Sequence, residues 1–205
     1  MFSVYLARIV EEFTGVPIED EFLPEFPLKR DLIWPEPQTD KSVKVDYVLF
    51  AKDRSRVVFV ELKTDSGSRR EAQDDYLNRA KELGFRKIVE GVRSIVLKTN
   101  AHQKYHHLTF ALARLGYLTL PADLKGFIHP EPRRGLVERL EKIAVTPLES
   151  KIDVIYLQPH ATAGDTCIDF ERVAAHVSKH SDPFSKRFAE HLLAWRLTAG
   201  AREPT

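Results

Sequence analysis

Three charged residues, Asp46, Glu61 and Lys63, stand on two otherwise apolar runs of β-forming residues between positions 43 and 63. The short polar segment between the two runs predicts a β-hairpin. With the tight turn centred on positions 53 and 54, Asp46 faces Glu61 across the hairpin, where directly opposed Cβ atoms lie about 5 Å apart. Lys63 follows Glu61 by two residues and therefore shares its face of the sheet. The pattern predicts two carboxylates and one amine on one side of the hairpin.

The two opposed carboxylates need a compensating positive charge. Like charges directly opposed across strands are destabilising, and a buried unpaired carboxylate costs still more free energy. A divalent cation bound between Asp46 and Glu61, with Lys63 beside it, would offset this repulsion. One or two carboxylates with several retained waters are what Mg²⁺ prefers. These residues therefore predict a magnesium-dependent site.

The same residues resemble the motif of the PD-(D/E)xK nuclease superfamily, whose members share the restriction-endonuclease-like fold. The resemblance rests on Asp46, a gap of fourteen residues, and then Glu61, Leu62 and Lys63. Val45 stands where the family pattern has a proline. The resemblance implies an α/β fold whose core is one helix, a three-stranded antiparallel meander, a second helix and a fourth strand.

Two further features extend the resemblance along the chain. In the RecB-type exonuclease branch, the helix after the lysine strand carries a glutamine and a tyrosine on one face. Here Gln73 and Tyr76 take these places, three residues apart rather than four, a spacing that still shares one helical face. A glutamate on the first helix often completes the site in this superfamily, and Glu11 and Glu12 are the candidates. The sequence therefore resembles RecB-type exonuclease-like members most closely.

The resemblance implies a set of metal ligands. Asp46 and Glu61 would bind one or two Mg²⁺ or Mn²⁺ ions, and the backbone carbonyl of Leu62 is a further candidate ligand. Glu11 or Glu12 would add a ligand through water or at a second metal. A metal held in this way lowers the pKa of a bound water and neutralises charge on a scissile phosphate.

The resemblance also implies roles for the neighbouring residues. Lys63 would orient or deprotonate the attacking water and stabilise charge on the phosphorus centre, and Gln73 and Tyr76 would position the substrate backbone. The predicted reaction is hydrolysis of phosphodiester bonds in DNA. Basic residues suited to phosphate contacts follow the lysine strand, and these are Arg69, Arg70 and Arg79.

The composition is that of a globular protein without a strong charge bias. The chain has 205 residues, 43% hydrophobic and 30% charged, and a net charge of +1, so overall charge does not indicate nucleic-acid binding. The single cysteine excludes an intramolecular disulfide and is compatible with a reducing cytoplasm. No charged region followed by an apolar core stands at the start, and no apolar run is long enough to span a bilayer. We expect a cytoplasmic protein without membrane contact.

The remaining pattern predicts one nuclease-like domain over residues 1–205, with a helical insertion at about 85–145. Apolar residues at helical spacing predict the first helix, and several prolines then exclude a long helix until the hairpin. The predicted core elements and C-terminal helices are a helix at 2–13, an edge strand at 28–34, the hairpin, a helix ending near 83, a strand at 152–157, and helices at 170–177 and 184–197.

The sequence also allows three other interpretations. In the first, the chain is a catalytically silent nucleic-acid-binding or assembly subunit of the same fold, and in the second it is a dimeric junction-resolvase-like endonuclease. DNA is the predicted partner of the nuclease and of these two alternatives, with a homodimer or a larger DNA-processing complex as the possible assembly. In the third interpretation the hairpin is an ordinary strand edge, and strand alternation places Lys44, Asp46, Glu61 and Lys63 on one solvated polar face.

Overall fold

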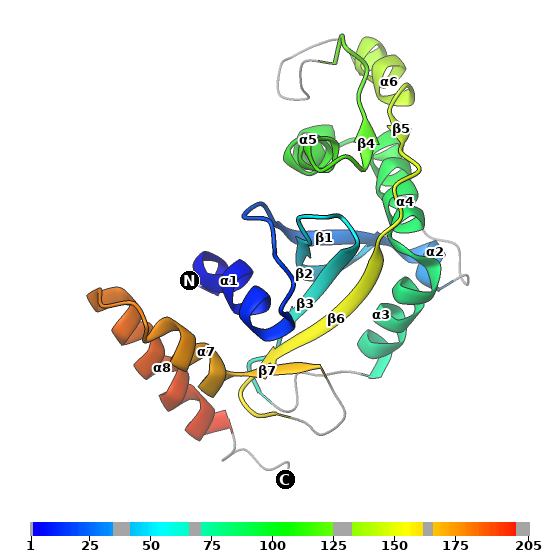
Figure 1. The fold of residues 1–205 in the computed structure, drawn as a ribbon. Helices are drawn as coiled ribbons and strands as arrows, with labels where there is room; N and C mark the ends of the chain where they lie inside the picture. Colours follow the sequence, from blue (N-terminus) through cyan, green and yellow to red (C-terminus); the bar gives the residue numbers. More distant parts are fainter. Residues whose placement is uncertain (1, 35–41, 66–70, 125–132, 162–165, 200–205) are drawn as a thin grey trace.

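The structure is a computed structural model that describes residues 2–34, 42–65, 71–124, 133–161 and 166–199. A five-stranded mixed sheet with the order β1-β2-β3-β6-β7 forms its centre, and helices cover both faces (Figure 1). This confirms the predicted α/β class. The strands of the sheet are β1 (Leu23–Lys29), β2 (Ser42–Phe50), β3 (Arg56–Leu62), β6 (Lys151–Gln158) and β7 (Cys167–Asp169).

The β2–β3 hairpin has the predicted register. Tyr47 pairs with Val60 and Phe50 pairs with Val57 in an antiparallel ladder, which ends one position before Asp46 and Glu61. Strand β1 pairs antiparallel with β2, whereas β6 pairs parallel with β3. A parallel pair needs a crossover connection, and residues 63–150 supply it.

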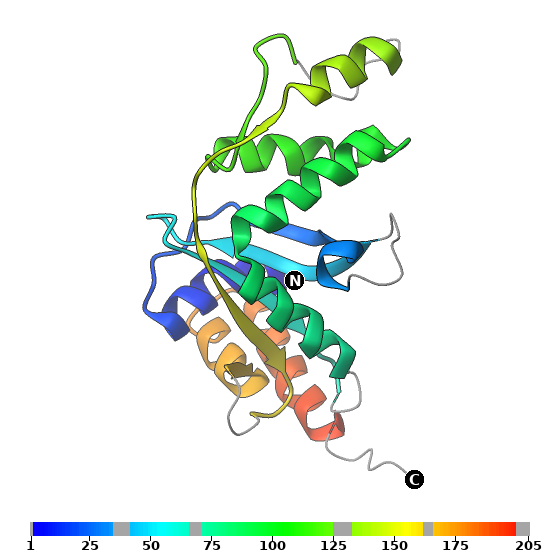
Figure 2. The same cartoon turned by 90° about the vertical axis from the view of Figure 1, so that its right-hand side faces the viewer.

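Two hydrophobic clusters fill the space on the two faces of the sheet. One cluster includes Phe59 from β3 and joins the sheet to α3 (Glu71–Leu83) and α4 (Phe85–Lys98), which lie along one face (Figure 2). The other includes Val60 and joins it to α1, α7 and α8. Because β3 is buried on both faces, it is apolar without alternation. The helices of the second face are α1 (Phe2–Thr14), α7 (Phe170–Val177) and α8 (Pro183–Ala199).

The predicted insertion at about 85–145 is not entirely helical. Helix α4 packs against β1 and belongs to the main core. The elements between α4 and β6 extend beyond the sheet (Figure 1). Tyr117 is buried against Phe85 and anchors this extension. Its elements are the 3-10 helix η2 (His102–Tyr105), α5 (His106–Arg114), β4 (Leu118–Thr119), α6 (Arg133–Glu141) and β5 (Ala144–Val145), and β4 pairs with β5 in a small second sheet.

Two details of the predicted strands are wrong. The edge strand expected at 28–34 is β1, which begins at Leu23, and α2 (Arg30–Ile33) occupies the second half of the expected range. Pro24 and Pro27 counted against a strand at these positions in the sequence. Prolines are nevertheless tolerated where a ladder hydrogen bond is dispensable, as at the edge of a sheet. The short strand β7 was not expected, because three residues carry too little pattern to identify.

Among the described residues, no helix combines the length and apolar character that crossing a bilayer requires.

The close packing of α4 against the end of β1 leads to a stability test. A Cβ atom on Gly91 would lie 2.6 Å from Leu32 Cδ1 and 3.2 Å from Lys29 Cβ. Overpacking should cost about 1–3 kcal/mol, which exceeds the gain of about 0.5–1 kcal/mol from helix propensity, so we expect Gly91→Ala to lower the unfolding free energy. Gly135→Ala in α6 is the matched control, since its nearest neighbour is a side-chain atom 4.0 Å away, and it should gain up to about 1 kcal/mol from helix propensity. Urea unfolding measures both, and equal effects of the two substitutions would contradict the packing.

Candidate active site

The acidic and basic residues of the motif lie where β3 ends. Glu61 is the second-to-last residue of β3 and is 1% exposed, while Lys63 follows the strand and is 5% exposed. The backbone N–H of Lys63 donates to the Leu157 carbonyl at 2.7 Å. This bond continues the parallel pairing of β3 with β6 and fixes the direction of the Lys63 side chain.

Glu61, Lys63 and Gln73 form a closed hydrogen-bonded network. Lys63 Nζ donates to Glu61 Oε2 at 3.2 Å and also donates to Gln73 Oε1. Gln73 Nε2 donates to the same Glu61 oxygen. The glutamine amide therefore bridges the two charged groups from the first turns of α3. The structure thus places Gln73 against the two charged residues at the end of β3.

Asp46 binds the end of β3 through its side chain. Its Oδ2 accepts a hydrogen bond from the Leu62 backbone N–H at 2.8 Å. The N–H and C=O of one strand residue point to the same side, so the Leu62 carbonyl also points toward β2. Leu62 therefore presents a backbone oxygen on the side of the Asp46 carboxylate, as the resemblance implied.

Strand β2 is irregular at Asp46. Val45 and Val48 both belong to the cluster under α3 and α4, although regular alternation would place them on opposite faces. The β1 residue opposite Asp46 in the register is Glu25, which has a left-handed φ of +51°. Left-handed non-glycine residues cost free energy and are concentrated at functional sites. The local irregularity separates Asp46 from the ladder and leaves its carboxylate half-buried beside Leu62.

Burial and charge raise the pKa of Glu61. Removal from water raises this pKa most, the Asp46 carboxylate raises it further, and Lys63 opposes both, which together bring it from 4.5 to about 7. Glu61 Oε2 accepts the two bonds of the network, whereas the buried Oε1 has no hydrogen-bond partner among the described residues. A buried acceptor without a partner is costly. The site thus holds one buried oxygen that a cation could bind.

These residues fit a hard divalent cation. The possible ligands are Glu61 Oε1, the Asp46 carboxylate and the Leu62 carbonyl, all of them oxygen. Within the described ranges, no group of three or more His, Cys, Asp and Glu side chains could hold a metal. Two carboxylates completed by a carbonyl and waters match the coordination of Mg²⁺, which retains several waters, better than that of zinc.

Tyr76 lies beside the network and remains neutral. Its hydroxyl donates to the Lys44 carbonyl at 3.3 Å. Burial raises its pKa far above the ordinary value, and the negative charge of Glu61 adds to the effect. The Tyr76 ring meets Trp34 edge to face at 5.6 Å, and the Arg30 guanidinium lies over the Trp34 ring. Two aromatic rings in edge-to-face contact and one guanidinium group therefore border the site.

Other predicted site residues lie elsewhere. Glu11 accepts from the Ile18 N–H at 3.1 Å, and Glu12 binds His176 and Lys179 of the region around α7 at 2.6–2.8 Å. The structure does not bring either carboxylate to Asp46 and Glu61, because the last turn of α1 faces the β2–β3 turn and α7. Arg79 pairs with Glu82 at 2.8 Å on the exposed side of α3. Two further candidates, Arg69 and Arg70, lie outside the described residues.

The solvated-edge interpretation is wrong for Glu61 and Lys63. Lys44 is exposed and pairs with Glu25 at 2.5 Å, as expected of a surface charge. Glu61 and Lys63, in contrast, are both nearly inaccessible. Charged residues are almost never fully buried unless they are paired, so this pair demands a structural or chemical reason.

Sequence reasoning missed two contacts around the site. Tyr156 pairs with Glu61 in the β3–β6 register, and its hydroxyl donates to Asp74 on α3. This bond ties α3 to β6 next to Gln73. The edge-to-face contact of Trp34 with Tyr76 was missed as well, although a tryptophan in a proline-rich segment could have indicated a packing contact. The Tyr156 contact had no sequence signal, because only the parallel pairing brings positions 74 and 156 together.

Comparison of the chain with protein-family models, with curated proteins and with solved structures found no match. The functional argument therefore rests on the chemistry and geometry of the site.

The raised pKa of Glu61 predicts a pH dependence of stability in the metal-free protein. The folded state holds the Glu61 proton more tightly than the unfolded chain, so the contribution is complete below about pH 4.5 and is lost as the pH rises through about 7. The expected loss from Glu61 is about 3 kcal/mol. Glu61→Gln should remove this part of the dependence.

The measurement is urea unfolding in the presence of a chelator over a series of pH values. Asp153→Asn is the control, because that carboxylate is only partly buried and pairs with Arg56 at the opposite end of β3. It should keep the dependence of the parent protein. If Glu61→Gln retains it too, the buried placement of Glu61 is wrong.

Proposed function

We propose that this protein is a Mg²⁺- or Mn²⁺-dependent nuclease that hydrolyses phosphodiester bonds in DNA by a PD-(D/E)xK mechanism. The single observation that carries the proposal is the buried Glu61–Lys63–Gln73 network, beside Asp46, in which one Glu61 oxygen has no hydrogen-bond partner among the described residues. The Asp46 carboxylate raises the pKa of Glu61, an electrostatic cost that a bound divalent cation would offset.

The arrangement of elements supports the same proposal. Helix α1 precedes the antiparallel strands β1, β2 and β3, and α3 and a parallel strand β6 follow. This is the order expected of a restriction-endonuclease-like core. The candidate residues lie on β2, on the end of β3 and on α3, the elements that the resemblance assigns to them.

Asp46, Glu61 and the Leu62 carbonyl would hold the metal ion. When bound, such an ion lowers the pKa of a coordinated water and polarises the phosphoryl oxygens. Glu61 must be ionised to act as a ligand, and its pKa of about 7 places that ionisation close to neutral pH.

Lys63 supplies the charge next to the reacting phosphate. Its ammonium has three N–H donors, and two of them reach Glu61 and Gln73. The third can donate to the attacking water or to a phosphoryl oxygen. Gln73 accepts a hydrogen bond from the ammonium and donates one to Glu61, which holds this third donor in place before substrate arrives.

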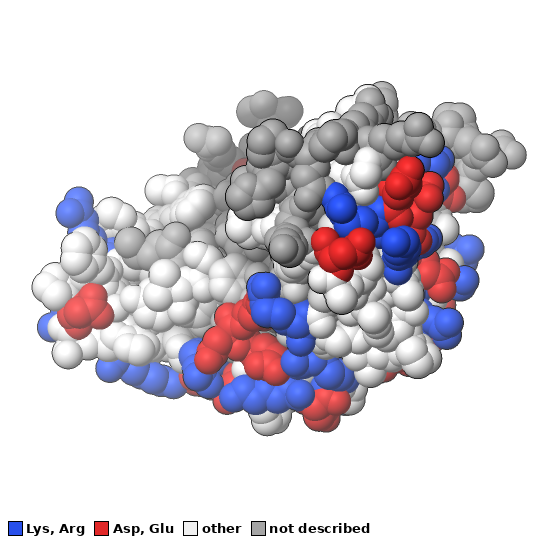
Figure 3. Space-filling view, turned by 90° about the horizontal axis from the view of Figure 1, so that it is seen from above, with Lys and Arg blue, Asp and Glu red and all other residues white. Residues whose placement is uncertain are grey.

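Substrate attraction must come from local charge. The net charge is only +1, and acidic and basic side chains are interspersed on the face seen in Figure 3. Ion pairs such as Arg54 with Glu19 and Arg8 with Asp20 also neutralise charges at the surface of the molecule. Arg30, whose guanidinium lies over the Trp34 ring, offers a cation near the site. We therefore expect few phosphate contacts and a shallow salt dependence of DNA binding.

Isosteric substitutions test the catalytic roles. Glu61→Gln and Lys63→Met should lower metal-dependent DNA cleavage at least about a hundredfold, because each removes charge that stabilises the transition state. Asp46→Asn should act similarly while its amide oxygen still accepts the Leu62 N–H. Asp153→Asn serves as the matched control and should cleave at the parent rate. Undiminished cleavage by Glu61→Gln or Lys63→Met would refute the assignment.

Metal binding can be tested without measuring activity. Mn²⁺ or Mg²⁺ at a hundredfold excess over its Kd should stabilise the protein by about 2.7 kcal/mol in thermal melts. Asp46→Asn and Glu61→Gln should lose this shift, while Lys63→Met should keep it because Lys63 is not a ligand. DNA binding by a protein that shows no metal-dependent shift would favour the silent nucleic-acid-binding subunit instead.

A further inference from the structure

A cavity lies directly after the candidate catalytic lysine. Its volume is about 240 Å³, and Thr64, Asp65, Trp195, Thr198 and Ala199 line it. Thr64 and Asp65 are the two residues after Lys63. The others lie on the last turns of α8, the helix that covers the sheet on the side opposite α3. The residues after β3 and the last turns of α8 therefore border a small, partly open cavity that begins one residue after Lys63 in the chain.

Trp195 forms the aromatic wall of this cavity. Its ring packs against the buried Phe170 with centroids 5.4 Å apart, while 39% of the residue remains exposed. Thr198 and Ala199 follow it by three and four residues and so share its side of the helix. Phe170 thus holds the tryptophan in place, and Trp195 presents aromatic surface to the cavity.

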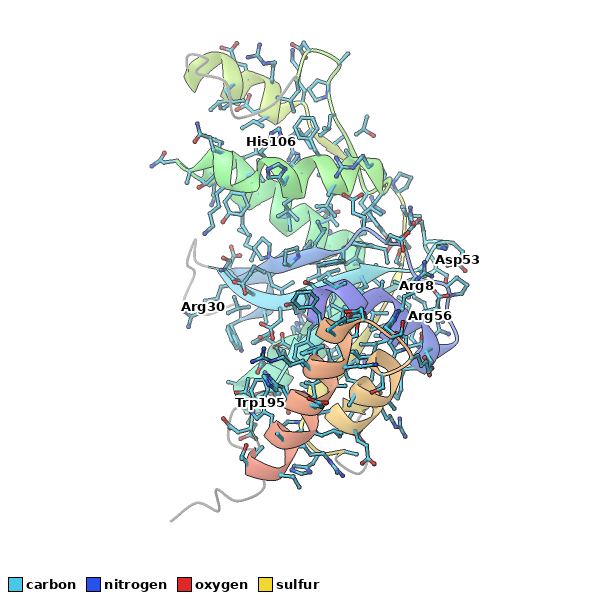
Figure 4. All side chains as sticks on the ribbon, turned by 90° about the vertical axis from the view of Figure 1, so that its left-hand side faces the viewer. Arg8, Arg30, Asp53, Arg56, His106 and Trp195 are labelled. Carbon is cyan, nitrogen blue, oxygen red and sulfur yellow. The ribbon has the colours of Figure 1, made fainter. Side chains whose placement is uncertain are left out.

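The position of Trp195 in the molecule agrees with this description. Figure 4 shows Trp195 at the opposite edge from Asp53 and Arg56. Because β3 begins at Arg56, Trp195 lies toward the end of the sheet at which β3 finishes. Consecutive Cα atoms are about 3.8 Å apart, so Asp65 Cα lies within about 8 Å of Lys63 Cα. A stacked DNA strand advances about 3.4 Å per nucleotide, so groups bound at these two positions can belong to neighbouring nucleotides.

The chemistry of the lining favours a base over a phosphate. None of the described residues that line the cavity is a lysine or arginine that would attract a phosphate, whereas the Thr64 and Thr198 hydroxyl oxygens can accept hydrogen bonds from a base edge. Drug-sized ligands occupy pockets of about 300–1,000 Å³, and this cavity of about 240 Å³ suits one smaller planar group. Aromatic side chains that stack on bases are the usual platforms for single strands.

Resting on the nuclease function proposed above, we propose that this cavity receives one unstacked nucleobase, stacked on Trp195, of a DNA strand whose neighbouring phosphate lies at Asp46 and Glu61. A base in an intact duplex remains in its own stack and cannot enter. The preferred substrate is therefore single-stranded DNA or a frayed end rather than a closed duplex.

Cleavage kinetics of Trp195 variants test the substrate class. Trp195→Ala should lower kcat/KM on single-stranded DNA by roughly fivefold to a hundredfold, the range given by alanine substitutions at base-stacking aromatics. Cleavage of closed circular duplex should change little. Trp195→Phe keeps an aromatic face and should retain most of the activity, which also guards against loss of folding. Leu197→Ala, on the same helix at a residue 76% exposed, is the matched control and should cleave like the parent.

Fluorescence tests the cavity independently of cleavage. The chain has two tryptophans, so Trp34→Phe leaves Trp195 as the sole tryptophan emitter. With Ca²⁺ in place of Mg²⁺, a single-stranded oligonucleotide should quench the Trp195 emission, and an oligonucleotide of abasic residues should not.

Quenching that is equal with both oligonucleotides, or absent with both, overturns the cavity assignment. Metal-dependent cleavage in which Trp195→Ala slows single strands and duplexes equally also overturns it, but leaves the nuclease proposal intact. If the parent protein cleaves no DNA while base-dependent quenching persists, the nuclease proposal fails and the cavity stands as a nucleobase-binding site. The two proposals can therefore fail separately.

Discussion

The burial of Glu61 and Lys63 at the end of the central strand is the constraint on which the site depends. Two opposite charges at 1% and 5% exposure lose most of their hydration, and Coulomb attraction repays that loss only with good geometry and further hydrogen bonds. Gln73 supplies such bonds to both partners. The half-buried Asp46 acts in the opposite direction by raising the pKa of Glu61. The charges of the cluster are therefore compensated only in part within the described residues, and Glu61 Oε1, which has no hydrogen-bond partner there, marks where compensation is missing.

The surrounding elements hold this cluster in place from three sides. The parallel pairing of β3 with β6 extends to Lys63 through the Leu157 carbonyl. Asp46 ties β2 to the last residue of β3, and the Asp74–Tyr156 bond ties α3 to β6. Each contact involves a different pair of elements, so the side chains are positioned by the sheet and helix together. Such preorganisation is what a site for charge stabilisation requires.

The two faces of the sheet contribute different things at the same end. Helix α3 brings Gln73 and Tyr76 to the charged cluster, while α8 on the other face brings Trp195 to the residues that follow Lys63. Strand β3 lies between the two and ends at Leu62. A substrate strand crossing the end of the sheet would meet charge on one side and an aromatic surface on the other. The proposed functions of the two regions are thus consistent with one binding path.

The sequence by itself determined the hairpin, its register and the helix after it. Apolar runs around a polar turn specify which residues oppose each other, and strand alternation then aligns Glu61 with Lys63. Helical spacing likewise put Gln73 and Tyr76 on one face of their helix, and the structure shows that this face contacts the sheet. These predictions succeeded because local periodicity and short connections leave few alternatives.

Only the tertiary structure decided which distant residues complete the site. It directed Glu11 and Glu12 to Ile18, His176 and Lys179, away from the cluster, because the packing of α1 against α7 sets which way its last turn faces. It also brought Tyr156 beside Glu61 and Trp195 to the cavity after Lys63. The irregularity of β2 at Asp46 became visible only from the two cores on either side of the sheet. Such contacts depend on how separate elements pack, and no periodicity within a single segment encodes them.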